Sequence, residues 1–202
     1  MKWLVRPFYR LVFRLRIEGQ EHEPADGACL ICANHISMHD IPLVGLALKR
    51  PIFFLAKAEV FRVKPIARFM RSFGVIPIHR GQADLAALHQ VMRDLDDGNF
   101  VGIFPQGTRC PGVAPEETEI KSGVGMIAYR TKSAVLPLHI ITKNNRIRWF
   151  RRIRVVVGAP ISYEEFGFEK GTMKEYDDAA CLIFSRICAL GSEAEKGATD
   201  EH

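Results

Sequence analysis

Residues 28–48 read ACLICANHISMHDIPLVGLAL, and this stretch decides the fold of the N-terminal half of the chain. Its first part, residues 28–32, is an uninterrupted apolar run with the length of a buried strand. Its last part, residues 41–48, is apolar again and predicts a helix. The polar segment 33–40 lies between them. His35 therefore stands directly after a strand, where α/β proteins place their reactive side chains.

Asp40 follows His35 by five residues, at the beginning of the expected helix. If Ser37 caps that helix, Asp40 is its third residue and can bend back toward the loop. The carboxylate could then accept a hydrogen bond from one ring nitrogen of His35 and leave the other nitrogen able to take a proton. Two alternatives stand beside this interpretation. Ser37 and Asp40 could form a helix cap without a catalytic role, or His35 and His39 could bind a metal ion, although no third ligand has an informative spacing.

The composition is that of one globular domain with enough apolar residues for a core: 202 residues, 48% hydrophobic and 25% charged. The net charge of +5 and the pI near 9.0 indicate an anionic partner, which could be nucleic acid, a membrane surface or a phosphorylated substrate. Of the five cysteines, Cys29 and Cys32 in the apolar run and Cys181 and Cys188 on a late helix are predicted to be reduced core residues rather than a disulfide framework. No apolar run reaches about 18 residues, so we expect no membrane-spanning segment.

Residues 1–16 predict an amphipathic helix. One side carries arginines at every fourth position with Lys2 extending the row, and the other side is apolar: Arg6, Arg10 and Arg14 against Trp3, Leu4, Phe8, Leu11, Val12 and Leu15. The arginines interrupt the apolar centre that a signal peptide requires. We interpret the segment as a helix on a membrane surface, with its arginines on lipid phosphates. The alternative is a helix packed on the protein's own core with a solvated basic face.

Further along the chain, apolar runs alternate with helical patterns. Expected strands cover residues 16–19, 28–32, 51–56, 74–78, 100–104 and 134–140, and expected helices cover 41–48, 65–73, 84–96, 121–132 and 173–190. This order predicts a single α/β domain, residues 17–190, whose largely parallel mixed sheet is flanked by helices. Residues 146–157 interleave arginines with apolar residues and are interpreted as an edge hairpin facing phosphates or as a solvated strand face. The polar residues 191–202 are predicted to be disordered.

Four segments, kept in order, resemble the motif blocks of glycerolipid acyltransferases. They are Asn34-His35-x-Ser37-x-x-Asp40, Gly74-x-Ile76-Pro77-Ile78-x-Arg80, Phe104-Pro105-x-Gly107-Thr108-Arg109 and Val135-Leu136-Pro137-Leu138. From about residue 34 to residue 140 the chain is similar to the bacterial lysophosphatidic acid acyltransferase (1-acylglycerol-3-phosphate O-acyltransferase) family. The third block departs from the family's usual Phe-Pro-Glu-Gly-Thr-Arg, because Gln106 stands where the family has Glu. That departure bears on the acceptor more than on the reaction type.

The resemblance implies transfer of a fatty acyl group from acyl-CoA or acyl-ACP to the free hydroxyl of lysophosphatidic acid, giving phosphatidic acid, without a cofactor. It implies that His35 is the general base, oriented by Asp40, and that Ser37 is not a nucleophile. The remaining implied site residues bind the substrate, the first three of them through the acceptor's phosphate: Arg109, Lys57, Arg80, Gly107, Thr108 and Gln106.

These expectations place the protein on the cytoplasmic face of the cell membrane as a peripheral or monotopic enzyme. Its expected partners are an anionic membrane surface, a lysophospholipid acceptor and acyl-CoA or acyl carrier protein, with no nucleic acid. Three alternatives remain: an acyltransferase for another lysolipid or lipid-like alcohol, a metal-dependent hydrolase using His35 and His39, and a basic nucleic-acid-binding module. Neither of the last two accounts for the third block.

Overall fold

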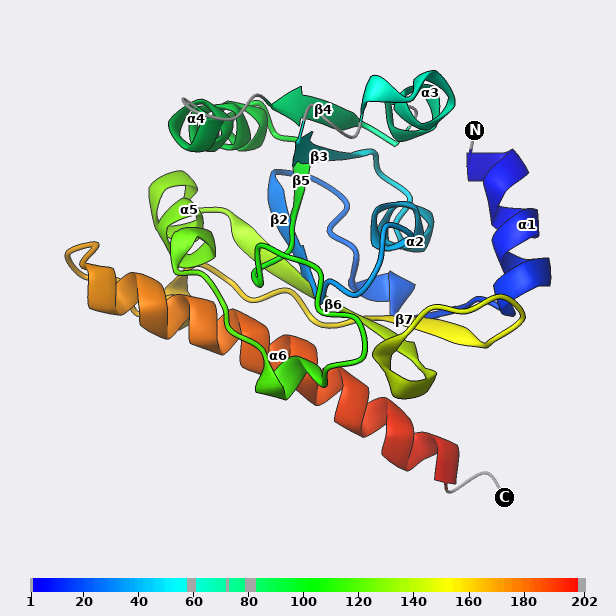
Figure 1. Cartoon of the computed structure of the whole chain (residues 1–202). Helices are drawn as coiled ribbons and strands as arrows, with labels where there is room; N and C mark the ends of the chain where they lie inside the picture. Colours follow the sequence, from blue (N-terminus) through cyan, green and yellow to red (C-terminus); the bar gives the residue numbers. More distant parts are fainter. Residues whose placement is uncertain (1, 58–60, 72, 79–82, 200–202) are drawn as a thin grey trace.

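One sheet of seven strands, in the order β1-β7-β6-β2-β5-β3-β4, forms the centre of the computed structural model, which describes residues 2–57, 61–71, 73–78 and 83–199 (Figure 1). The strands are β1 (Arg16–Glu18), β2 (Cys29–Ala33), β3 (Ile52–Lys57), β4 (Val75–Ile78), β5 (Phe100–Ile103), β6 (Ala134–Thr142) and β7 (Ile153–Val157). The five strands from β6 to β4 are mutually parallel, whereas β7 is antiparallel to β6 and parallel to β1. The expected α/β class with a largely parallel mixed sheet is confirmed.

Helices cover both faces of this sheet. They are α1 (Lys2–Phe13), α2 (Asp40–Ala47), α3 (Lys64–Arg71), α4 (Ala83–Asp96), α5 (Gly123–Thr131) and α6 (Met173–Thr199). In Figure 1, α1 and α2 lie on one side of the sheet, and α5 and α6 lie on the other. The side chains of β2 alternate accordingly: Ile31 joins the apolar cluster under α1 and α2, whereas Leu30 joins the cluster under α4, α5 and α6.

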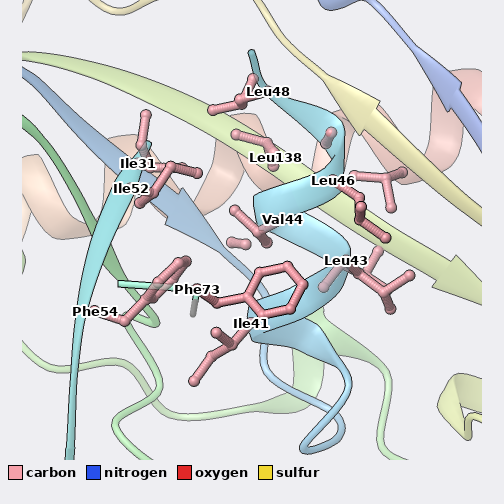
Figure 2. Packing of buried hydrophobic residues seen from close by; sticks show 14 of the residues in the cluster. Ile31, Ile41, Leu43, Val44, Leu46, Leu48, Ile52, Phe54, Phe73 and Leu138 are labelled. Carbon is pink, nitrogen blue, oxygen red and sulfur yellow. The ribbon is translucent and has the colours of Figure 1, made fainter. Parts of the chain in front are cut away.

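The helix α2 is enclosed by the rest of the protein. Every residue from Asp40 to Ala47 is buried, as expected for a short helix with no polar face. Figure 2 shows its side chains packed among Ile31 of β2, Phe54 of β3, Leu138 of β6 and Phe73. Because α2 is held on all sides, its N-terminal end keeps a fixed position relative to the end of β2.

The N-terminal helix α1 packs on the core through Tyr9, Val12 and Phe13 and exposes Arg10, and Arg14 directly after it is exposed as well. The helix ends at Phe13, three residues earlier than the sequence predicted. Arg14 has a left-handed backbone conformation, with φ 44°, which a right-handed helix does not contain. Among the helices in the described ranges, none combines the length and apolar character needed to cross a membrane.

The expectation of an edge hairpin at residues 146–157 is wrong. Residues 146–152 form no strand, and β7 lies inside the sheet between β6 and β1. Its apolar residues Ile153, Val155 and Val157 are buried, and Arg154 donates two hydrogen bonds to the carboxylate of Glu18 on β1. The pairing partner β1 lies near the other end of the chain, so no local pattern could reveal that both edges of β7 are paired with other strands.

The expectation of a disordered tail after residue 190 is corrected up to Thr199. The helix α6 continues through Ser192 and Ala194 to Thr199. Arg154 of β7 donates a hydrogen bond to the carbonyl oxygen of Ala194 over 2.9 Å, and Ala194 is buried. This bond attaches the tail to the sheet. The five cysteines are unpaired as predicted, but Cys181 is exposed on α6 rather than part of the core.

Candidate active site

The strands β2 and β5 are parallel neighbours whose chains turn to opposite faces of the sheet. β2 leads to α2 in the apolar cluster of one face, and β5 leads to α5 in the cluster of the other. Open α/β sheets bind ligands at such a switch point, in the crevice beyond the carboxyl ends of the strands. His35 follows β2 by two residues, and Phe104 directly follows β5. The fold therefore brings the first and third motif blocks together at this crevice.

His35 and Asp40 form a hydrogen-bonded pair. Asp40 Oδ2 lies 2.7 Å from His35 Nδ1 and also accepts the backbone N–H groups of Ile36 (2.6 Å) and Ser37 (2.7 Å). Because Oδ2 is the acceptor in all three bonds, the hydrogen of the imidazole is on Nδ1. Asp40 is completely buried. Burial raises the pKa of Asp40, and the N–H donors of His35, Ser37 and Ile36 oppose that rise.

The prediction that Asp40 bends back toward the loop is confirmed, but Ser37 is not the helix cap. The N-cap of α2 is His39, and Ser37 Oγ accepts the backbone N–H of His39 over 3.2 Å. Pro42 has no N–H to donate, so the carbonyl of Met38 cannot accept the bond that a cap at residue 38 would need. The first bond of the helix runs from Leu43 N–H to the carbonyl of His39.

The segment after β5 holds His35 by three contacts. The ring of Phe104 stacks on the imidazole, with centroids 4.0 Å apart and planes at 11°. Gln106 Oε1 accepts the backbone N–H of His35 over 2.6 Å, and the carbonyl of His35 accepts the N–H of Cys110 over 2.8 Å. The side chain of His35 remains 17% exposed. Its Nε2 has no hydrogen-bond partner within the described part of the chain and is therefore available to accept a hydrogen bond.

Asn34 attaches the loop to β6, the neighbour of β2 on the side away from β5. This buried amide donates to the carbonyl of Ile140 over 3.1 Å and accepts the N–H of the same residue over 2.7 Å. The two bonds continue the pairing of β2 with β6 beyond Ala33, the last residue of the ladder. The strand end before His35 is therefore fastened to its neighbour.

His39 contacts α1. Its Nδ1 lies 2.8 Å from the hydroxyl of Tyr9. Burial lowers the pKa of His39 and raises the pKa of Tyr9, so a neutral ring and a neutral hydroxyl share this hydrogen bond. Within residues 2–57, 61–71, 73–78 and 83–199, no three His, Cys, Asp or Glu side chains are arranged to hold a metal ion, and His35 and His39 bond separately to Asp40 and Tyr9.

A cavity of about 670 Å³ is lined by residues between 106 and 121, two of which, Gln106 and Cys110, bond to the backbone of His35. Four of the predicted site residues meet there: Gln106, Gly107, Thr108 and Arg109. Gly107 has φ +66°, a left-handed conformation that favours glycine. Lys57 ends β3, the neighbour of β5, but the structure does not describe its side chain, and Arg80 lies outside the described residues.

Two residues of this cavity were not predicted from the sequence. Lys121 places a second cation in the lining that holds Arg109, and Thr118 accepts a hydrogen bond from Gln106 Nε2 over 2.8 Å. Neither residue lies in a motif block, and neither has a spacing that signals a site. Their contribution follows from the turn at η3 (Pro115–Glu117), which folds residues 118–121 back over the third block.

A parallel-sheet crevice that holds a buried carboxylate, an imidazole and a cation-lined cavity is what an α/β enzyme with a histidine base requires. Comparison with known proteins identifies the family. Residues 14–141, well over half of the chain, match the Acyltransferase family, and the chain belongs to that family.

Individual relatives agree with this membership. The chain is 26% identical to a 1-acyl-sn-glycerol-3-phosphate acyltransferase of Bacillus subtilis over 155 residues, which is 75% of this chain and 76% of that protein. It is 38% identical to a lyso-ornithine lipid O-acyltransferase of Pseudomonas aeruginosa over 112 residues, covering 54% of this chain and 41% of that protein. The fold is similar to the crystal structure of the 1-acyl-sn-glycerophosphate (LPA) acyltransferase of Thermotoga maritima, with a TM-score of 0.60 and 24% identity over 85% of this chain and 70% of that chain.

Proposed function

We propose that this acyltransferase moves a fatty acyl group from acyl-CoA or acyl-ACP to the free hydroxyl of lysophosphatidic acid, giving phosphatidic acid. The observation that carries the proposal is the His35–Asp40 pair, in which Nδ1 is held on a buried carboxylate while the His35 side chain stays 17% exposed. An alcohol attacks a thioester poorly until a base removes its proton, and this imidazole is oriented to do so.

The chemistry needs no covalent acyl-enzyme. His35 Nε2 takes the hydroxyl proton while the acceptor oxygen forms a bond to the thioester carbonyl carbon. The tetrahedral intermediate then collapses, the carbon–sulfur bond breaks, and the imidazolium returns its proton to the leaving thiolate. Asp40 stabilises the imidazolium between these two steps through the 2.7 Å bond to Nδ1.

The acceptor's phosphate is assigned to the cavity beside His35. Arg109 and Lys121 line it, so an anion there meets a guanidinium that can bind two oxygens and an ammonium that acts as a point charge. Gln106 lines the same cavity and bonds to the backbone of His35, which places the cavity next to the proposed base. The similarity to the Bacillus subtilis enzyme supports a glycerophosphate acceptor.

A second acceptor is favoured by another feature of this cavity. Glu117 and Glu119 line it together with Arg109 and Lys121, so it offers carboxylates to an ammonium as well as cations to an anion. A lysolipid with an amino-acid headgroup carries both charges. The similarity to the lyso-ornithine lipid acyltransferase of Pseudomonas aeruginosa supports this candidate.

We also propose that the protein binds the cytoplasmic face of an anionic membrane as a peripheral or monotopic protein. Arg6, Arg10 and Arg16 line a cavity of about 410 Å³ between α1 and β1. Large apolar side chains are exposed on the same helix and on the loop before β7: Phe8, Leu11, Trp149 and Phe150. The rings of Phe8 and Trp149 touch edge to face, 6.4 Å between centroids, so the two segments form one surface. Arginines beside exposed aromatics suit phosphate headgroups above acyl chains.

The deciding experiment is lipid product analysis by mass spectrometry with purified protein. Lysophosphatidic acid and lyso-ornithine lipid are each offered with acyl-CoA and with acyl-ACP, and His35→Ala serves as the inactive control. We expect phosphatidic acid from the wild type and a loss of about 10²–10⁴-fold or more in His35→Ala. Ornithine lipid as the main product would favour the second acceptor. Equal product from the wild type and His35→Ala would contradict the proposed mechanism for either acceptor.

A further inference from the structure

Three hydrogen bonds in series join His35 to the turn on the far side of the cavity. The backbone N–H of His35 donates to Gln106 Oε1 over 2.6 Å, and Gln106 Nε2 donates to Thr118 Oγ1 over 2.8 Å. The hydroxyl of Thr118 then donates to the carbonyl of Pro115 over 2.6 Å. Gln106 is only 3% exposed, and Thr118 is half-buried at the other end of this chain of bonds.

The direction of these bonds is determined at both ends. At His35 a backbone N–H can only donate, so Gln106 must present its oxygen there. At the other end, Thr118 Oγ1 and the carbonyl oxygen of Pro115 are 2.6 Å apart, and two oxygens that close need the hydroxyl hydrogen between them. The lone pairs of Oγ1 therefore face Gln106. The side chain at position 106 must accept at one end and donate at the other.

We propose that Thr118 is a positioning residue for the acyl transfer, acting through Gln106 on the backbone of His35 and so on the direction of the imidazole. The inference rests on the proposed role of His35 as the base. It also gives a reason for Gln106, because a neutral amide satisfies both ends. An ionised carboxylate would offer two acceptors and would face the lone pairs of Thr118.

The test compares two substitutions of Thr118. Thr118→Val keeps the shape and removes the hydroxyl, whereas Thr118→Ser keeps the hydroxyl. Thr131→Val is the matched control, because the hydroxyl of Thr131 donates within α5, to the carbonyl of Ile127 over 2.8 Å. We expect Thr118→Val to lower kcat about 10- to 100-fold with little change in KM, since small misplacements of a catalytic group have effects of this size. Thr118→Ser and Thr131→Val should stay within about threefold of the wild type.

A second measurement needs no substrate. The Nδ1–H proton of the His35–Asp40 bond should give a downfield proton NMR resonance, identified by its loss in His35→Ala. We expect this resonance to shift or broaden in Thr118→Val and to remain in Thr118→Ser and Thr131→Val. An inactive wild type with this pattern of resonances would count against the proposed acceptors while supporting the role of Thr118.

Gln106→Glu changes the other partner of the bond to Thr118 and allows a double-mutant comparison. Alone it should lower kcat about tenfold, and combined with Thr118→Val it should cost less than the product of the two single effects, because the opposing lone pairs are gone. The inference is overturned if Thr118→Val keeps the kcat and the Nδ1–H resonance of the wild type, or if it changes KM alone. Effects of the two substitutions that multiply independently would overturn it as well.

Discussion

Asp40→Asn separates the charge of the carboxylate from its geometry. The amide oxygen can replace Oδ2 and keep the N–H donors of His35, Ile36 and Ser37, so the imidazole keeps its tautomer. The amide nitrogen then takes the place of Oδ1, which is buried and has no partner among the described residues. The substitution removes the negative charge that faces the imidazolium, and leaves the fold with one unsatisfied N–H₂ group.

The expected loss follows from the distance between the two groups. Unit charges separated by the 2.7 Å between Nδ1 and Oδ2 attract by about 6 kcal/mol at an effective dielectric constant of about 20. The whole of that attraction would be worth about 10⁴-fold in rate. The amide dipole keeps part of it, so we expect kcat to fall about 10²- to 10⁴-fold. The unpartnered amide nitrogen costs about 1–3 kcal/mol of stability, offset by the removal of a buried charge.

The assay is release of the free thiol from the acyl donor, with the lipid product confirmed by mass spectrometry and the melting temperature measured in parallel. We expect the Tm of Asp40→Asn to stay within about 4 °C of the wild type, because the opposing terms leave a net change of about 1 kcal/mol or less. A folded Asp40→Asn with kcat within tenfold of the wild type would refute the role given to the carboxylate. A Tm lower by much more than this would show that the pair is chiefly structural.

Three further predictions concern the acceptor, the membrane and pH. Arg109→Ala should raise KM for lysophosphatidic acid about 10- to 100-fold, with Arg130→Ala on α5 as an unaffected control, because a charge-assisted bond is lost; an unchanged KM would place the phosphate elsewhere. Arg10→Glu with Arg14→Glu should weaken sedimentation with anionic vesicles about tenfold or more at low salt and less at high salt, whereas Arg130→Glu should not; equal sedimentation would contradict a role of α1. Burial lowers the pKa of His39 from 6.5, so the unfolded chain binds a proton at His39 more readily than the folded protein does. The folded protein therefore loses stability as the pH falls below 6.5 and keeps it above that pH. The Tm of the wild type should therefore fall more between about pH 7.5 and pH 5.5 than that of His39→Asn; parallel curves would contradict this.

The central strand and helix could be predicted because their signal is local. An apolar run ending in Asn34-His35 and an apolar helix after Asp40 identify β2, α2 and the return of the carboxylate toward the loop. The helix cap was missed because a serine three residues before an acid suggests a capping box, whereas the first helical bond runs from the N–H of Leu43 to the carbonyl of His39. A local pattern gives the partners of a residue within one turn but not which of two competing bonds forms.

The rest of the site depends on contacts between distant segments. Gln106 was recognised as a departure from a family motif, but its partners, the backbone of His35 and the hydroxyl of Thr118, are determined by the ends of two strands and by the turn at η3. The same limit explains the error at β7. Alternating apolar residues showed one buried face, and only the pairing with β1 shows that both edges of the strand are occupied.

The pairing of β1 with β7 also has a consequence for folding. Arg16 aligns with Arg154, so the N-terminal segment joins the sheet only after most of the chain is present. A helix as short as α1 is marginal in isolation, and its Tyr9 and Phe13 are almost fully buried against the domain. Residues 2–18 therefore belong to the same cooperative unit as the sheet. Deleting them would uncover apolar core, so charge reversal on the exposed face is the cleaner way to separate membrane attachment from stability.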